Sequence, residues 1–86
     1  MKQNIYQLYC SKEEGALRVS LIKKMFYKTY ADKALVDKPQ NYIYSYNPNY
    51  YFSLSRKALV QKAREMKAEW IKELEIKLEM YKNIKI

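Results

Sequence analysis

Apolar and polar residues alternate with a period of two along the first half of this chain, a pattern typical of β-strands that bury one face. The alternation runs through residues 5–10 and resumes at 17–23, and the polar turn between them contains Gly15, the only glycine in the sequence. We therefore predict a hairpin of two strands. β-Favouring residues continue through 25–31, which predicts either a third strand or the continuation of a bent second strand.

A second group of strand signals follows a polar segment. We expect residues 32–40 to form a loop, within which 31–36 could make one helical turn. Tyrosines then alternate through residues 42–46, the Asn47-Pro48-Asn49 run gives a strong turn signal, and residues 50–53 can pair back. These patterns predict two further short strands.

The period changes to that of a helix in the last third of the chain. Ten apolar side chains fall within about 140° of arc on a helical projection: Leu59, Val60, Ala63, Met66, Trp70, Ile71, Leu74, Leu78, Tyr81 and Ile84. Ser53 or Ser55 can cap the start of this helix, and no glycine or proline interrupts it over 55–82. The predicted fold is α+β, with a small antiparallel sheet of three to five strands packed by one long C-terminal amphipathic helix in a single domain, 1–86.

The predicted helix is longer than the predicted sheet. A helix over 55–82 would be roughly 42 Å long, whereas a sheet of four or five strands is only about 19–24 Å wide. The apolar stripe continues beyond that width through Leu74, Leu78, Tyr81 and Ile84. Three arrangements could cover it: a helix that runs diagonally or folds back, a homodimer, or docking on a different protein.

Composition narrows the class of protein. The chain has 86 residues, a net charge of +8 and a pI of about 9.5, which favours encounters with polyanions or acidic proteins. No run approaches 18 apolar residues and no apolar leader segment is visible, so we expect neither a membrane span nor export. A lone Cys10 cannot form an internal disulfide, which favours a cytoplasmic location.

Most familiar enzyme chemistry requires residues that this sequence lacks. Histidine is absent, so no histidine base or histidine metal ligand exists, and one cysteine cannot build a zinc site. One glycine cannot make a phosphate-binding loop. We therefore expect a protein that is not an enzyme and that holds no cofactor or metal.

Aromatic residues concentrate in one window. Tyr42, Tyr44 and Tyr46 should share one side of a strand, where rings can stack on bases while nearby lysines neutralise phosphates. The alternative is a sheet face packed beneath a helix. The remaining candidate contacts around this row are two tyrosines and four cations: Tyr50, Tyr51, Arg18, Lys23, Lys24 and Lys28.

The start of the predicted helix carries a second candidate site. Arg56 and Lys57 oppose the helix macrodipole, which normally favours acidic residues at this end. Together with exposed amide groups and the hydroxyls of Ser53 and Ser55, they could bind a phosphate oxygen. The alternative is that the two long side chains simply extend into water.

Three segments carry a resemblance to a known class of proteins: Lys28-Thr29-Tyr30, the strand-to-helix passage from Tyr51 to Ala58, and Lys72 to Ile86. In these the chain resembles small accessory proteins of phages and mobile elements of low-GC bacteria, including anti-CRISPR proteins. The resemblance implies a non-enzymatic inhibitor that occludes a nucleic-acid-processing defence complex, with a host protein or ribonucleoprotein as partner in the bacterial cytoplasm. The alternative is a standalone DNA- or RNA-binding regulator.

Overall fold

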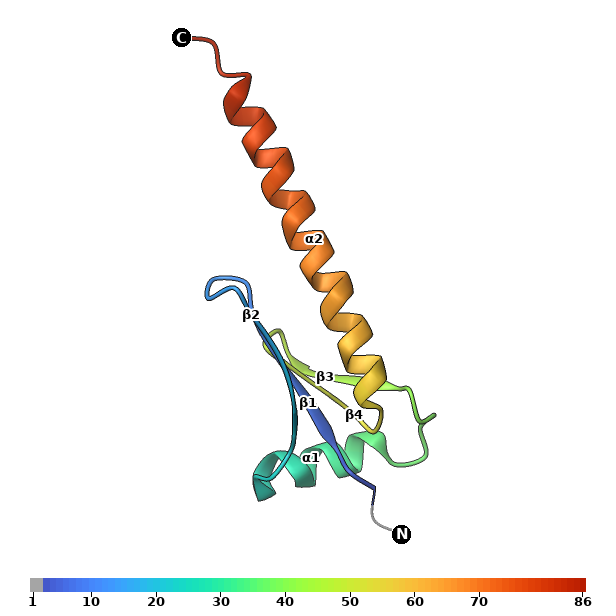
Figure 1. Ribbon diagram of the computed structural model, residues 1–86. Coiled ribbons are helices and arrows are strands. Elements are labelled where there is room, and N and C mark those ends of the chain that lie inside the picture. The colour runs from blue at the N-terminus through green and yellow to red at the C-terminus, as the bar shows by residue number, and fades with distance from the viewer. Residues whose placement is uncertain (1–2) are drawn as a thin grey trace.

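Four antiparallel strands and two helices make up residues 3–86, which the computed structural model describes (Figure 1). Met1 and Lys2 lie outside the described residues. They belong to the N-terminal segment on which the prediction about export was based. The elements are β1 (Tyr6–Ser11), β2 (Ala16–Leu21), α1 (Met25–Leu35), β3 (Ile43–Asn47), β4 (Tyr50–Ser53) and α2 (Arg56–Lys82). The strands form one sheet in the order β2-β1-β4-β3, and the α+β class is as predicted.

Most predicted elements are present at nearly the predicted positions. The strands predicted at 5–10, 17–23, 42–46 and 50–53 correspond to β1, β2, β3 and β4 to within two residues at either end. The helix predicted at 55–82 is α2. These are the segments in which the hydrophobic period and the turn residues agree with each other.

The predicted strand at 25–31 is wrong, because this segment is helix α1. A helix places Tyr27, Ala31 and Leu35 on one face, since each lies four residues after the last. Ala31 and Leu35 are buried, and the Tyr27 ring lies 6.0 Å from the ring of Phe52. This four-residue spacing of core contacts prevails over the β-propensity of the individual residues.

The two hairpins are held by their turn residues. Gly15 adopts a φ of +67°, which L side chains rarely adopt, and Ser11 Oγ accepts a hydrogen bond from the amide of Glu14 at 3.2 Å. In the β3–β4 turn, Asn47 Oδ1 accepts from the Asn49 amide at 2.8 Å. These bonds set the register of the strands on either side.

The β3–β4 turn is also bonded to β1. The side-chain amide of Asn49 donates to the carbonyl of Cys10 at 2.8 Å, and the Cys10 thiol donates to the carbonyl of Pro48 at 3.2 Å. Burial raises the pKa of the Cys10 thiol, which therefore stays protonated. Cys10 has a structural role in this arrangement.

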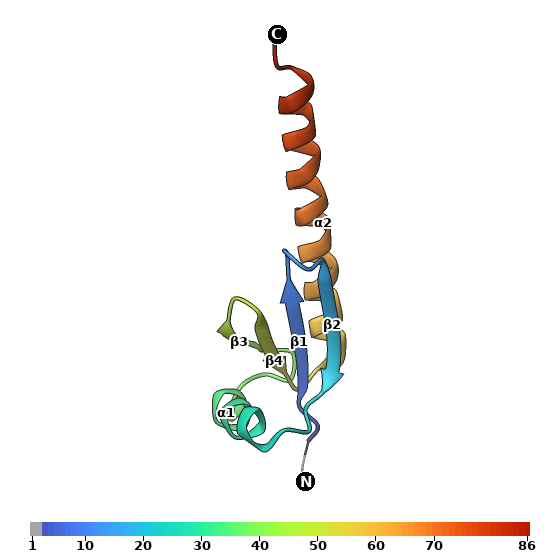
Figure 2. The same ribbon diagram turned by 90° about the vertical axis from the view of Figure 1, so that its left-hand side faces the viewer.

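The helices cover different parts of the sheet. α2 packs across β1, β2 and β4 on one face, where Leu8 and Leu59 are fully buried. α1 packs beside β3 and β4, and Figure 2 shows it at the opposite side of the sheet from α2. The half of that second face formed by β1 and β2 therefore has no helix packed across it within the described residues.

α2 begins on the sheet and ends far from it. Ser55 Oγ caps the helix by accepting a hydrogen bond from the Ala58 amide at 3.1 Å. The last contact with the sheet is an ion pair between Lys12, in the β1–β2 turn, and Glu73. Beyond it the helix projects without a break, and the molecule measures 64 × 22 × 16 Å (Figure 1). The helix therefore does not fold back, and its C-terminal apolar residues do not pack against the strands.

Candidate anion-binding surfaces

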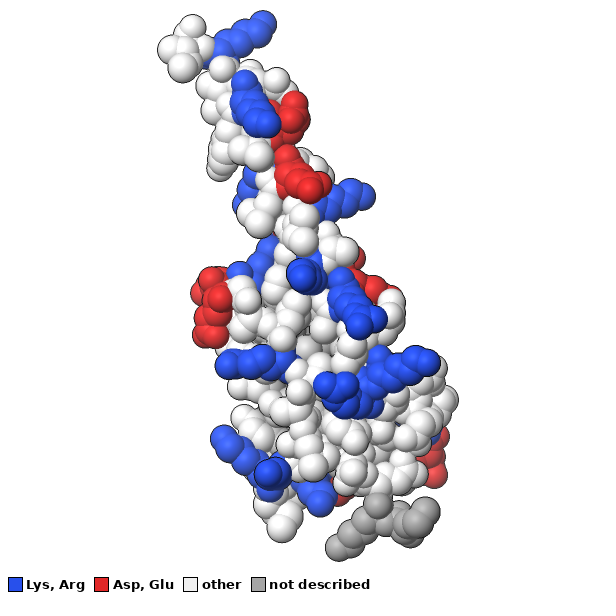
Figure 3. Space-filling view, in the orientation of Figure 1, with Lys and Arg blue, Asp and Glu red and all other residues white. Residues whose placement is uncertain are grey.

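The start of α2 is strongly cationic. Residues 56–64 carry four cationic side chains and no acidic one: Arg56, Lys57, Lys62 and Arg64. Among residues 3–86 the ion pair found is Lys12 with Glu73, so no carboxylate of the described chain lies within salt-bridge distance of these four. Lys and Arg side chains gather around α1 and the start of α2 in Figure 3. We call these four residues the cationic cluster.

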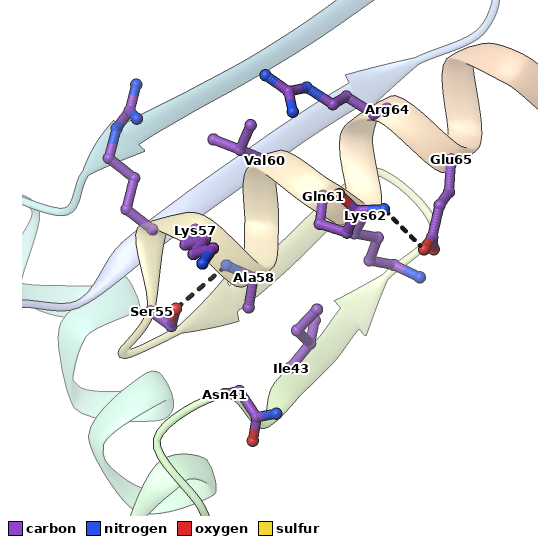
Figure 4. A pocket seen from close by; sticks show the side chains of 11 residues that line it. Asn41, Ile43, Ser55, Lys57, Ala58, Val60, Gln61, Lys62, Arg64 and Glu65 are labelled. Atoms are coloured by element: carbon purple, nitrogen blue, oxygen red, sulfur yellow. Dashed lines mark hydrogen bonds between the residues drawn. The ribbon is translucent and has the colours of Figure 1, made fainter.

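The cationic cluster surrounds an open, shallow hollow of about 660 Å³. Figure 4 shows Ala58 and Lys62 on the side of α2 that faces Ile43 of β3, with Val60 and Arg64 on the other side. The charges are thus spread around the first turns of the helix. Such an open surface suits an extended anion, because small-molecule sites bury most of their ligand.

Lys62 is positioned by an aromatic ring. Its ammonium group lies 4.7 Å from the centroid of the half-buried ring of Tyr51, a cation–π distance. The serine hydroxyls expected to face a ligand make internal hydrogen bonds instead. Ser53 Oγ accepts from the Ser55 amide at 3.1 Å, and Ser55 Oγ caps α2. The long cationic side chains, rather than the hydroxyls, are the groups available to an anion.

A second surface lies on the same face of the sheet as α1, mainly on β1 and β2, and it ends at Tyr50 of β4, whose ring stacks on Tyr27 of α1 at 5.7 Å. The Arg18 guanidinium lies 5.0 Å from the centroid of the Tyr9 ring, and that ring lies 5.3 Å from the ring of Tyr50. These residues line a hollow of about 510 Å³, and a neighbouring hollow of about 260 Å³ adds Lys23 and Lys24. We call this group of five residues the sheet-face surface.

The Tyr9 phenol is held in its protonated form. Partial burial raises the pKa of Tyr9, and a 3.2 Å hydrogen bond that its hydroxyl donates to Glu14 raises the pKa further. The ring is therefore a neutral stacking surface at physiological pH, with one guanidinium against it. A nucleic-acid base could stack there while the lysines contact the phosphates.

The predicted tyrosine row is divided by the fold. A β-bulge interrupts the pairing of β3 with β4 between Ser45 and Asn47. Tyr44 and Tyr46 lie on the side of β3 that packs against α1, where the Tyr46 ring lies 6.2 Å from that of Tyr27. Both are half-buried. Tyr42 lies apart from them, exposed before β3, with the Lys38 ammonium 5.2 Å from its ring.

The structure brings together part of each predicted site. Tyr50 joins Arg18, Lys23 and Lys24 in the sheet-face surface, whereas Lys28 lies half-buried on α1. Tyr51 lies on the opposite sheet face, beside the cationic cluster that contains Arg56 and Lys57. The predicted contacts therefore do not form one surface but are divided between the two faces of the sheet.

Three residues of the surfaces were missed by sequence reasoning. Lys62 and Arg64 could have been found from the absence of any acidic residue over 56–64. Tyr9 could have been found from its place opposite Arg18 in a predicted hairpin, since the two residues are direct cross-strand neighbours.

No protein family, curated protein or solved structure matches this chain. Neither helix within residues 3–86 is long and apolar enough to cross a membrane. The same residues contain no group of three metal-ligating side chains. Function is therefore inferred from the two surfaces themselves.

Proposed function

We propose that this protein is a non-enzymatic inhibitor that binds a nucleic-acid-processing complex through the cationic cluster and acts by occlusion. The observation that carries the proposal is a set of four cations, at the start of one helix, that form no salt bridge with any carboxylate of the described chain; Glu65, which lines the same hollow, accepts a hydrogen bond from Gln61 instead. Like charges held this close repel one another, and the helix macrodipole adds to the repulsion. An external anion relieves both effects.

A nucleic-acid-processing complex offers suitable anions. Its bound RNA or DNA presents phosphates, and arginine pairs with phosphate through two parallel hydrogen bonds. A rigid domain attached there blocks the path of the substrate without any chemistry. A host defence complex in the bacterial cytoplasm is the specific form of this proposal, and it is supported by the resemblance to anti-CRISPR proteins.

The test compares two variants with the same change in net charge. Arg56→Glu/Arg64→Glu reverses two charges of the cationic cluster, and Lys33→Glu/Lys38→Glu reverses two exposed charges outside it. Each tagged protein is used as bait in a host lysate that has not been treated with nuclease, so that complexes keep their RNA or DNA, and retained proteins are identified by mass spectrometry. A nucleic-acid-processing complex should be retained by wild type and by the Lys33/Lys38 variant but lost from the Arg56/Arg64 variant. Equal retention by both variants would contradict the proposal.

The sheet-face surface supports a second candidate function, a standalone DNA- or RNA-binding regulator. Here the two rings Tyr9 and Tyr50 provide a stacking surface beside Arg18. Binding of a single strand through about three phosphate contacts should weaken roughly 20-fold between 50 and 200 mM salt. Tyr9→Ala should lower affinity for a single-stranded oligonucleotide about tenfold, in line with the loss of one base stack. Arg56→Glu/Arg64→Glu should leave that affinity largely unchanged, which separates the two candidates.

A further inference from the structure

The projecting end of α2 carries an apolar stripe with no cover. Leu74, Leu78, Tyr81 and Ile84, here called the tail stripe, are 53 to 67% exposed. Leu74, Leu78 and Tyr81 follow one another at intervals of four and three residues, the spacing of the d, a and d positions of a coiled coil. From this we propose that a second copy of the chain packs antiparallel along the tail stripe.

The sheet determines the direction in which the second copy runs. Leu59 and Trp70 lie on the same helical face as the tail stripe, and this face is covered by the sheet up to the contact at Glu73. Packed helices lie about 8–10 Å apart, so in a parallel pair the two sheets would occupy the same space between the helices. In an antiparallel pair the sheets lie at opposite ends, and the tails alone overlap.

Charge complementarity gives the register. Glu75 and Lys82 both occupy e positions of this heptad, and e positions face e positions in an antiparallel pair. Placing Leu78 opposite Tyr81 of the second copy brings Glu75 beside Lys82 of the second copy, and symmetry makes this pair twice. The register shifted by one heptad brings Glu75 beside Glu75 of the second copy.

The fold also makes the shifted register sterically unfavourable. It would place the end of the second helix level with Trp70, where residues of the β1–β2 and β3–β4 turns already lie. The favoured register keeps the second helix beyond Glu73. Its overlap is short and falls at the small end of specific interfaces, so we expect a Kd on the order of 100 µM.

The first test uses two positions with equal exposure. Leu78 lies in the tail stripe and Ile76 lies on the opposite side of the helix, and both are 53% exposed. Sedimentation equilibrium between 5 µM and 1 mM should show a dimer for wild type and for Ile76→Glu, and an affinity at least about tenfold weaker for Leu78→Glu. Circular dichroism checks that both variants fold.

The second test addresses register and direction. Glu75→Lys alone and Lys82→Glu alone should each dimerise more weakly than wild type, because each puts like charges together. A mixture of these two variants should form a heterodimer, because both cross-copy pairs then have opposite charges. Weak association in the mixture overturns the antiparallel register. A wild-type protein that stays monomeric at 1 mM overturns the proposal entirely and leaves a different protein as the occupant.

Discussion

The head of this molecule, residues 3–70, and its tail, residues 71–86, use similar residues in opposite ways. In the head, Leu8, Phe52 and Leu59 are fully buried, and cations outnumber acidic residues by twelve to six. In the tail, large apolar side chains are exposed and the charges are four cations and three acids. One helix continues through both regions. The neighbours of a helical face, and not its composition, therefore decide whether its apolar residues form a core or a contact surface.

The comparison also separates stability from binding. The head contains the sheet, both hairpin turns and the helix cap, so it should account for nearly all of the free energy of unfolding. Every residue of the tail is exposed, and Glu73 forms an ion pair with Lys12 of the head. Substitutions in the two regions should therefore differ sharply in their effect on stability.

Phe52→Ala should have the largest effect. Its ring is fully buried and packs against three tyrosine rings, those of Tyr27, Tyr44 and Tyr46, so truncation leaves a cavity. We expect a loss of about 3–5 kcal/mol in the free energy of unfolding, measured by urea denaturation. Leu78→Ala, measured at 5 µM protein, should change it by less than about 0.5 kcal/mol. Similar losses for the two variants would contradict the division into head and tail.

Gly15→Ala should have the next largest effect. Nothing lies within 4 Å of an added Cβ, so the penalty comes from the positive φ of the backbone alone. We expect a loss of roughly 1–2 kcal/mol by the same urea assay. An unchanged stability would show that the turn relaxes into another conformation.

Removing the helix cap with Ser55→Ala should reduce the free energy of unfolding by about 1 kcal/mol. The hydroxyl of Ser55 satisfies the Ala58 amide, which alanine leaves without a partner. Ser55→Asp serves as a control, because aspartate caps equally well and also suits the helix macrodipole. Equal losses for the two variants would show that capping is not the cause.

Breaking the ion pair at the boundary should have the smallest effect. Lys12 and Glu73 are both about half-exposed, so Lys12→Ala should change the free energy of unfolding by at most about 1 kcal/mol. A loss well above that value would mean that the β1–β2 turn supports the tail more strongly than a single exposed ion pair allows. A double-mutant cycle with Glu73→Ala measures the coupling directly.

The sequence predictions were accurate where local signals determine the structure, and they failed where a contact between distant segments determines it. Both hairpins and α2 were predicted because local signals, the alternation, the turn residues and the helical period, all agree at those positions. α1 was missed because Phe26, Tyr27 and Tyr30 favour strands by propensity, and only contact with Phe52 selects the helix. A contact between segments that are distant in the sequence cannot be predicted from the pattern of residues within one segment.

The candidate surfaces show the same limit. The unpaired cations at Arg56 and Lys57 and the exposed tail residues follow from charge and length alone, and both were predicted. Alternation places Tyr44 and Tyr46 on one side of β3, but it does not show which side of the sheet a helix covers. Because α1 was predicted as a strand, its packing over these two tyrosines could not be predicted either.

Hydrogen–deuterium exchange along α2 can distinguish the packed part of this helix from its exposed end. At 5 µM protein, amides of residues 59–70 should exchange slowly, near the rate set by global unfolding, whereas amides of 74–82 should exchange orders of magnitude faster. The tail is too short to be a stable helix without a partner. Protection of 74–82 should then increase as the protein is concentrated. Equal, strong protection along the whole of α2 at 5 µM would contradict the account.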